Sequence, residues 1–399
     1  MSQITRFFQK EFKGLLGFAF RRFIVDLRNF LNFKKFYEIE ENPKYDKNTT
    51  SILKNIYKDL NIINHNASWN SFKERENNFK KSKKIINKYT KKIKKNLINQ
   101  KTVRSELNND GFLKLGKKIN ISKCKNIIKN LKNKKVYNAH HVLFSTSKKE
   151  DFYTIKQKYI NACYDYKDIF SIPDLTKIII NEENIKKIYN YFGCVPTVNT
   201  ILLSWTFDKF NYDYGTQIFH RDVDDYRQCN LFTILTDTKD GNGGHEVYKR
   251  TQNFKYVKKV FENKKYLSKK YKFLNPSLFF NMPIGKTTGY GNNEIYSDYF
   301  NQDKVKLCGA PGSSFLTDAY ALHRGVPPKK RARLMLWTSY TLLSEASSSY
   351  RNFLAMQKKS TNSKRILKRV KYNCISNVVK ITDLIKYSFR NIIDFNNDK

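Results

Sequence analysis

Two histidines stand where their neighbours could help them to bind a metal ion. The first lies in the segment FHRDVDD (219–225), where His220 precedes Asp222 by two positions. Side chains two residues apart on a β-strand point to the same face, so a strand here would direct His220 and Asp222 to one ion. Asp224 shares that face if the strand stays regular, which leaves two candidate carboxylates. The second histidine is His323, at the end of an apolar run and before a turn.

Two imidazoles and one carboxylate on one face of an octahedron leave three coordination positions open, which suits non-haem Fe(II) oxygen chemistry. Three of the remaining histidines lack a carboxylate two residues away: His65, His140 and His141. His245 follows the turn-forming segment DGNGG and has only Glu246 beside it, which on a strand points to the opposite face. We therefore interpret His245 as an ordinary strand or loop histidine.

An arginine near the second histidine could bind an anion. Arg333 begins the strand-like segment RLMLW, and an arginine clamps a carboxylate bidentately better than a lysine does. A dicarboxylate cosubstrate would need such a residue. Arg331 shares the strand face of Arg333 but lies in the polar turn PPKKR, so Arg333 is the stronger candidate. Arg324, next to His323, is expected to point away from the metal.

The elements that must position these residues are short strands after about residue 140. Runs rich in β-branched and aromatic residues predict them, and the turn signals DGNGG and GAPG lie between two pairs. The predicted strands cover 200–207, 216–220, 230–237, 245–249, 313–318 and 332–343. Such a series predicts a β-sandwich, jelly roll or barrel.

Both ends of the chain are predicted to be helical. Apolar residues recur at helical spacing between Phe12 and Phe30, with arginines towards the other side. This helix would pack on the protein's own core or, as the alternative, lie on an anionic membrane. A lysine-rich helix is predicted over 77–99, where Ile86 and Tyr89 begin an apolar repeat and the lysines form a solvated face. We expect a helical basic region over 1–140, a β domain over 141–345 and a basic helical extension over 346–399.

The chain of 399 residues carries 76 Lys and Arg against 35 Asp and Glu, for a formal charge of +41. Such a charge would favour a nucleic-acid partner, but only 16 of the basic residues are arginine, the residue best suited to bidentate phosphate and base contacts. Nucleic acid is therefore the less favoured partner. Six scattered cysteines without a CxxC pair indicate reduced, mostly buried thiols. With neither a signal sequence nor a credible membrane span, a cytoplasmic protein is expected.

Two runs of this sequence resemble the phytanoyl-CoA dioxygenase-like branch of the Fe(II)/2-oxoglutarate-dependent oxygenases. They are TQIFHRDVDDYRQCNLFTILTDTKDGNGGHEVYKRTQN and GAPGSSFLTDAYALHRGVPPKKRARLMLWTSY. The resemblance covers roughly residues 150–345 and implies an α+β chain whose double-stranded β-helix (jelly roll, cupin-like) core carries helical N-terminal and C-terminal additions. It departs from the family pattern at KRTQN (249–253), which replaces a Pro-Gly-Ser-His-like turn. The stretch 254–302 that follows is expected to form a lid or substrate loop.

Carried onto this sequence, the resemblance implies roles for five residues. His220, Asp222 and His323 would bind Fe(II), and Arg333 would bind the distal carboxylate of the cosubstrate 2-oxoglutarate. Gln217 matches a position that lines the active site. Asp224 and Asp225 would support the ligands or form a turn.

The resemblance also implies a reaction: hydroxylation of a small molecule with O2, with formation of succinate and CO2. Asp222 favours hydroxylation over halogenation, because related halogenases have a small residue in place of the carboxylate. The alternative is a catalytically silent jelly roll that binds an anionic membrane surface or nucleic acid through its basic helices. The sequence indicates neither the substrate class nor the oligomeric state.

Overall fold

The computed structural model describes most of the predicted β domain and two stretches of the region before it. The described residues are 72–89, 106–137, 149–164, 168–169, 171–179, 181–208, 215–222, 225, 227–239, 241–271, 274–281 and 293–342. The predicted helix over 12–30 and the predicted extension over 346–399 lie outside this part of the chain.

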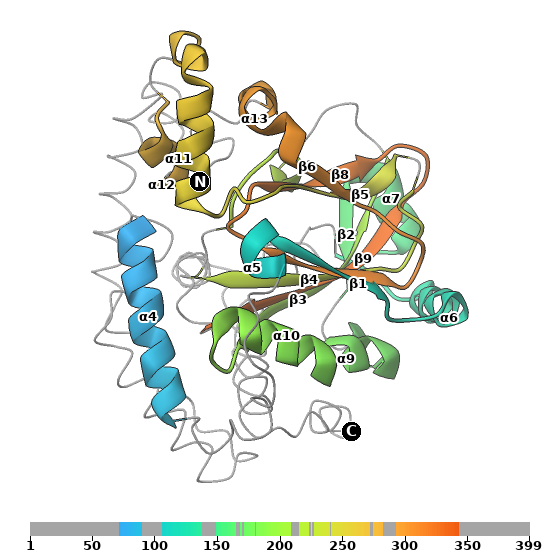
Figure 1. Ribbon diagram of the computed structural model, residues 1–399. Coiled ribbons are helices and arrows are strands. Elements are labelled where there is room, and N and C mark those ends of the chain that lie inside the picture. Colours follow the sequence, from blue (N-terminus) through green and yellow to red (C-terminus); the bar gives the residue numbers. More distant parts are fainter. Residues whose placement is uncertain are drawn as a thin grey trace, which may run out of the picture.

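Two antiparallel sheets pack against each other (Figure 1). The larger sheet has the strand order β1-β7-β4-β9-β3-β2 and the smaller sheet the order β6-β5-β8. The strands of the larger sheet are β1 (Phe112–Lys117), β2 (Asn161–Cys163), β3 (Thr197–Thr206), β4 (Gln228–Ile234), β7 (Ser313–Asp318) and β9 (Arg333–Thr341). Those of the smaller sheet are β5 (Asn242–Tyr248), β6 (Lys304–Leu307) and β8 (His323–Pro328).

The central strands of the larger sheet are apolar on both faces. On β4, Cys229 and Leu231 belong to the cluster that packs on helices, whereas Ile234 belongs to the cluster between the two sheets. On β9, Leu334 and Met335 divide in the same way. A strand covered on both faces reads as a continuous apolar run, and the alternation decides which side chains reach the space between the sheets.

Helices cover the outer face of the larger sheet (Figure 1). These are α6 (Ile121–Leu131), α9 (Pro173–Ile179) and α10 (Glu182–Phe192). The side chain of Asn181 caps α10 by accepting from the backbone N–H of Asn184, and Gly193 ends it in the left-handed conformation at φ 67°. Three shorter elements are α5 (Glu106–Asp110), α7 (Phe152–Lys158) and η5 (Gly215–Gln217).

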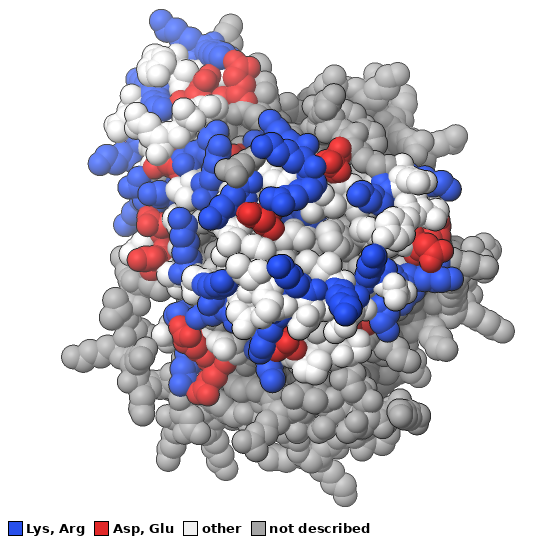
Figure 2. Space-filling model, turned by 90° about the vertical axis from the view of Figure 1, so that its right-hand side faces the viewer, with Lys and Arg blue, Asp and Glu red and all other residues white. Residues whose placement is uncertain are grey.

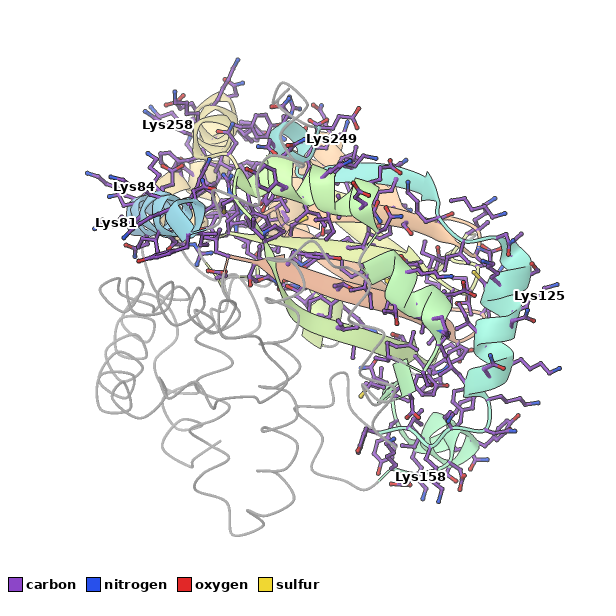
Figure 3. All side chains as sticks on the ribbon, turned by 90° about the horizontal axis from the view of Figure 1, so that it is seen from below. Lys81, Lys84, Lys125, Lys158, Lys249 and Lys258 are labelled. Atoms are coloured by element: carbon purple, nitrogen blue, oxygen red, sulfur yellow. The ribbon has the colours of Figure 1, made fainter. Side chains whose placement is uncertain are left out.

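Helix α4 (Phe72–Tyr89) begins before the predicted lysine-rich tract and confirms its helical structure up to Tyr89. Its buried side chains are Arg75, Ser82 and Ile86. Lys81 and Lys84 are exposed and point away from the body of the protein in Figure 3, as expected for a solvated face. The rest of the tract lies beyond the described residues.

A helical insertion follows β5 instead of an irregular loop. It consists of α11 (Phe254–Asn263), η6 (Lys265–Lys269), α12 (Pro276–Asn281), α13 (Asn293–Phe300) and η7 (Asn301–Asp303). Its aromatic side chains form a separate apolar cluster together with Phe219, Tyr248 and Leu322 of the β core. The insertion therefore packs on residues next to the two candidate metal histidines.

Several sequence predictions differ from the structure. The segment that follows His323, predicted as a turn, forms strand β8 up to Pro328. Residues 216–220 do not form a strand: η5 is followed by a single bridge between His220 and His323, because the segment meets β8 only at its first residue. Strand β1 lies in the region predicted to be helical and pairs with β7, so the main sheet begins before the expected boundary at residue 140.

The other general expectations concern cysteines and membranes. Of the described cysteines none forms a disulfide; Cys124, Cys163, Cys194 and Cys229 are buried and Cys308 is exposed. Among the helices of the described residues, none combines the length and apolar character that crossing a membrane requires.

Candidate metal centre

The two candidate histidines meet across a backbone bridge. The N–H of His220 donates to the carbonyl of His323 (2.9 Å), and the N–H of His323 donates back to that of His220 (3.0 Å). Asp222 is fixed nearby because its N–H donates to the carbonyl of Ala319 (2.9 Å). This pairing, rather than a regular strand, brings the three side chains together.

His220, Asp222 and His323 form a group that could hold a metal ion. One ligand atom from each lies within 4.8 Å of the others. The two oxygens of Asp222 face one histidine each: Oδ1 lies 3.5 Å from Nε2 of His220 and Oδ2 lies 3.6 Å from Nε2 of His323. The side chain of Asp222 is 20% exposed and that of His323 is 4% exposed, so the group opens to solvent on one side only.

Hydrogen bonds orient all three side chains. Nδ1 of His220 lies 2.7 Å from the carbonyl oxygen of Ile218, and Nδ1 of His323 lies 2.8 Å from that of Ala321. A carbonyl only accepts, so each Nδ1 carries a hydrogen, which leaves Nε2 of each ring as the atom that could bind a metal ion. Nδ2 of Asn230 donates to Oδ2 of Asp222 (3.1 Å) and fixes the carboxylate.

The electrostatics of the group favour a bound cation. Burial opposes ionisation of Asp222, but the two histidines and the amide of Asn230 outweigh it and hold its pKa well below the usual value. Burial also opposes the charge on His323, yet the carboxylate of Asp222 raises the pKa of His323 above its usual value. An ionised carboxylate between two imidazole nitrogens is the donor set that a divalent transition metal prefers.

The metal group lines a cavity of about 100 Å³ between the two sheets. Its walls are formed by Leu202, Ser204, Thr206, Thr216, His220, Asp222, Asn230, Phe232, Gly244, His245, His323, Gly325, Arg333, Met335 and Trp337. These residues include the inward-facing positions of β3, β4 and β9, as the alternation along these strands requires. The cavity thus contains both the metal group and the candidate arginine.

Arg333 is a buried cation without a carboxylate partner among the described residues. It is 8% exposed and donates through Nη1 to the carbonyls of Gly244 (2.8 Å) and Val326 (2.9 Å) and through Nη2 to Oγ1 of Thr206 (3.1 Å). Burial lowers its pKa to about 10, which still leaves it charged at neutral pH. A buried charge is costly unless it is paired, so this site is suited to an anion.

Two glycines of β5 lie against the arginine. A Cβ on Gly243 would lie 2.9 Å from Cδ of Arg333, and the residue has a φ of 97°. Gly244, at φ 117°, supplies the carbonyl that accepts from Arg333. The segment DGNGG is therefore more than a turn, because its last residues begin β5 and form the seat of the guanidinium group.

Three other residues considered from the sequence, Arg331, Arg324 and Gln217, are not part of the cavity lining. The side chain of Arg331 is 65% exposed and lies 3.7 Å from the carboxylate of Asp237, outside the cavity. Arg324 donates to Glu246 (2.7 Å) and thus points away from the metal group, as predicted. Gln217 is buried in η5, but the cavity lining includes its neighbour Thr216 and not Gln217.

The segment FHRDVDD contains two further acidic residues, Asp224 and Asp225. Asp225 is buried and accepts the backbone N–H of Leu342 (2.8 Å), so it anchors the chain after β9 rather than the metal group. Asp224 lies outside the described residues.

The structure corrects the interpretation of His245 as an ordinary strand or loop histidine. It lies on β5, as expected, but its buried side chain lines the cavity and its ring stacks on His323 with 5.1 Å between centroids. Burial lowers its pKa well below the usual value, so the ring is neutral. Glu246 does point to the opposite face, so the spacing of carboxylates and histidines gives no signal for His245. The place of His245 in the cavity follows from the pairing of β5 with β8, in which His245 lies opposite Gly325.

No protein-family model matches this chain, and no curated protein matches it. Among solved structures, it is similar to AviO1 from Streptomyces viridochromogenes Tue57, at 13% identity and a TM-score of 0.34 over 59% of this chain and 91% of that chain. It is also similar to EctD from S. alaskensis, solved with 2-oxoglutarate and 5-hydroxyectoine, at 11% identity and a TM-score of 0.37 over 62% of this chain and 78% of that chain. At such TM-scores these similarities do not indicate a function.

Proposed function

We propose that this protein is an Fe(II)/2-oxoglutarate-dependent dioxygenase that hydroxylates a small molecule. The observation that carries the proposal is the pairing, in one cavity, of a His-Asp-His group with a buried arginine that lacks an acidic partner among the described residues. The two antiparallel sheets that enclose this cavity support the interpretation of the core as a double-stranded β-helix.

The donor set fits iron. His220, Asp222 and His323 offer two imidazole nitrogens and one carboxylate, and their hydrogen bonds to backbone carbonyls and to Asn230 hold these donor atoms in place. Three protein ligands leave open positions for a chelating cosubstrate and for oxygen. Iron bound here with 2-oxoglutarate and O2 would supply the oxidant for a substrate C–H bond, with succinate and CO2 as coproducts.

The role of Arg333 follows from its surroundings. Its guanidinium is held by Gly244, Val326 and Thr206, so it would bind a carboxylate without first losing side-chain freedom. A linear dicarboxylate with its 2-oxo end on the metal would place the other carboxylate at Arg333. The apolar side chains of Leu202, Phe232 and Met335 line the same cavity and would exclude water from the remaining surface.

Hydroxylation is the proposed reaction because the carboxylate of Asp222 belongs to the metal group. A halogenase would need that ligand position to be free for a halide. The intact group also argues against a catalytically silent jelly roll. None of the described residues from 254–302 lines the cavity, so the substrate class stays open and the helical insertion is not assigned a lid function.

The decisive experiment measures succinate formation by the purified full chain with Fe(II), ascorbate and 2-oxoglutarate, with and without candidate substrates. We expect slow turnover in the absence of substrate and stimulation by the correct small molecule. His220→Ala should abolish both metal binding and succinate formation. Unchanged metal binding and turnover in this variant would disprove the proposed function.

Arg331→Ala is the matched control, because this arginine is exposed and lies outside the cavity. We expect wild-type turnover from it. A membrane or RNA retention assay at rising salt concentration tests the alternative function, since electrostatic binding must weaken with salt.

A further inference from the structure

His245 is a cavity residue to which the proposed mechanism gives no role. It follows Gly244, whose carbonyl accepts from Arg333, and it pairs across the smaller sheet with Gly325. Only 4% of the residue is exposed, yet its side chain contributes to the cavity lining. It therefore lies between the arginine and the metal group.

The ring of His245 is held in place by aromatic neighbours. Its centroid lies 4.6 Å from that of Phe232, 5.7 Å from that of Phe315 and 5.1 Å from that of His323. Its Nε2 atom is buried and has no hydrogen-bond partner in the part of the chain described. Buried polar atoms are nearly always hydrogen-bonded, so an unpartnered nitrogen beside a ligand cavity points to a partner on the ligand.

We infer that Nε2 of His245 donates a hydrogen bond to a carboxylate oxygen of the ligand held between the metal group and Arg333. The inference rests on the proposed function, because that function supplies a ligand with a carboxylate at each end. A carboxylate only accepts, so the neutral ring must carry its proton on Nε2. His245 would then be a second, uncharged anchor that fixes the cosubstrate along the cavity.

The test compares equilibrium binding of 2-oxoglutarate to the Ni(II)-loaded full chain by calorimetry. His245→Phe keeps an aromatic ring between Phe232 and His323 but removes the donor, and we expect binding to weaken roughly tenfold or more. His245→Gln packs less well but keeps a donor, and we expect it to recover part of the affinity. A merely structural role predicts the reverse order. Thermal unfolding without 2-oxoglutarate checks that His245→Phe remains folded.

Pyruvate serves as the second probe, because it shares the 2-oxo acid end and lacks the distal carboxylate. Weaker binding of 2-oxoglutarate alone would assign the hydrogen bond to the distal carboxylate, and weaker binding of both would assign it to the end at the metal. Wild-type affinity of His245→Phe for both acids would overturn the inference and leave the proposed function intact. Failure of the wild-type chain to bind 2-oxoglutarate in the presence of metal would overturn the proposed function and this inference with it.

Discussion

At the scale of single residues, the buried charge on Arg333 opposes the stability of the folded protein. Its donors reach two carbonyls and one hydroxyl, but no described carboxylate neutralises it. A buried charge without a charged partner costs stability, so an apolar side chain of similar size removes that cost together with the hydrogen bonds, whereas binding an anion there requires the charge. Stability and function therefore place opposite demands on this position.

Arg333→Met tests whether the charge lowers stability and is required for anion binding. Methionine keeps the unbranched stem and removes the charge, so we expect the free energy of unfolding without ligand to change by no more than about 1 kcal/mol. Affinity for 2-oxoglutarate should fall at least about thirtyfold, because a charge-assisted contact is lost. Denaturant unfolding and calorimetry measure the two effects. Undiminished 2-oxoglutarate affinity would contradict the assignment, and Arg331→Met is the exposed control.

At the scale of elements, the first residues of β5 decide whether Arg333 can reach its position. Gly243→Ala places a Cβ 2.9 Å from Cδ of Arg333 in a backbone conformation with φ 97°. Gly241→Ala is matched to it, because Gly241 also has a positive φ (74°) but no described atom lies within 4 Å of the position that its new Cβ would take. The pair separates backbone strain from displacement of the arginine.

We expect Gly241→Ala to cost about 1 to 2 kcal/mol of stability and to leave 2-oxoglutarate binding unchanged. Gly243→Ala should cost about 2 to 4 kcal/mol, because strain and overpacking add, and should weaken 2-oxoglutarate binding as well. Thermal unfolding and calorimetry on both variants check this. Equal binding by the two variants would show that Gly243 does not seat the arginine.

A second element-scale contact joins the metal segment to the helical insertion. Arg221, between His220 and Asp222, is 3% exposed and donates to the carbonyl of Thr251 (2.8 Å). Its guanidinium also lies over the rings of Phe279 and Phe280, with 5.0 and 5.1 Å to their centroids. The insertion thus stabilises the backbone that carries two of the candidate metal ligands, although none of its described residues lines the cavity.

Arg221→Met should loosen this contact. We expect faster amide hydrogen exchange in 251–263 and 276–281 than in the wild-type chain, because the tie to Thr251 and the cation–π contacts are lost. Exchange in α6 and α10 should stay unchanged, since neither helix contributes to these contacts. Hydrogen exchange with mass spectrometry measures both regions, and equal exchange throughout would contradict the proposed tie.

The sequence predicted the positions of most strands because their periodicity and turn signals are local. It also predicted that His220, Asp222, His323 and Arg333 share one site, and these side chains line one cavity, although His220 lies in a bridge and not in a strand. It missed β1, β2, β6 and β8, and it misjudged His245. These elements depend on pairing with distant strands, such as β7 for β1 and β5 for β8. Local patterns do not specify such partners.

At the scale of the whole molecule, the charged side chains are spread over the face that Figure 2 shows. Figure 2 shows basic and acidic side chains interspersed, with uncharged surface between them. Lys81, Lys84, Lys125 and Lys158 are exposed and extend away from the body of the protein in Figure 3. These exposed lysines lie outside the cavity that contains the candidate metal group.

Replacing these four lysines with glutamine should therefore change little. We expect the free energy of unfolding to shift by no more than about 0.5 kcal/mol per site and affinities for metal and 2-oxoglutarate to match the wild type. Retention on anionic vesicles and on RNA should also be unchanged. A marked loss of retention on either would instead support the alternative function, in which basic surfaces bind an anionic partner.

The site also links the two sheets, which gives ligand binding a global consequence. His323 comes from the smaller sheet and Arg333 from the larger one, so a ligand that contacts the metal and Arg333 together would hold both sheets. A ligand that binds only the folded chain stabilises it by about 2.7 kcal/mol at one hundred times its Kd. We expect Ni(II) alone to raise the unfolding midpoint, and Ni(II) with 2-oxoglutarate to raise it further. In His220→Ala the added effect of 2-oxoglutarate should disappear, and its persistence there would mean that the acid binds without the metal group.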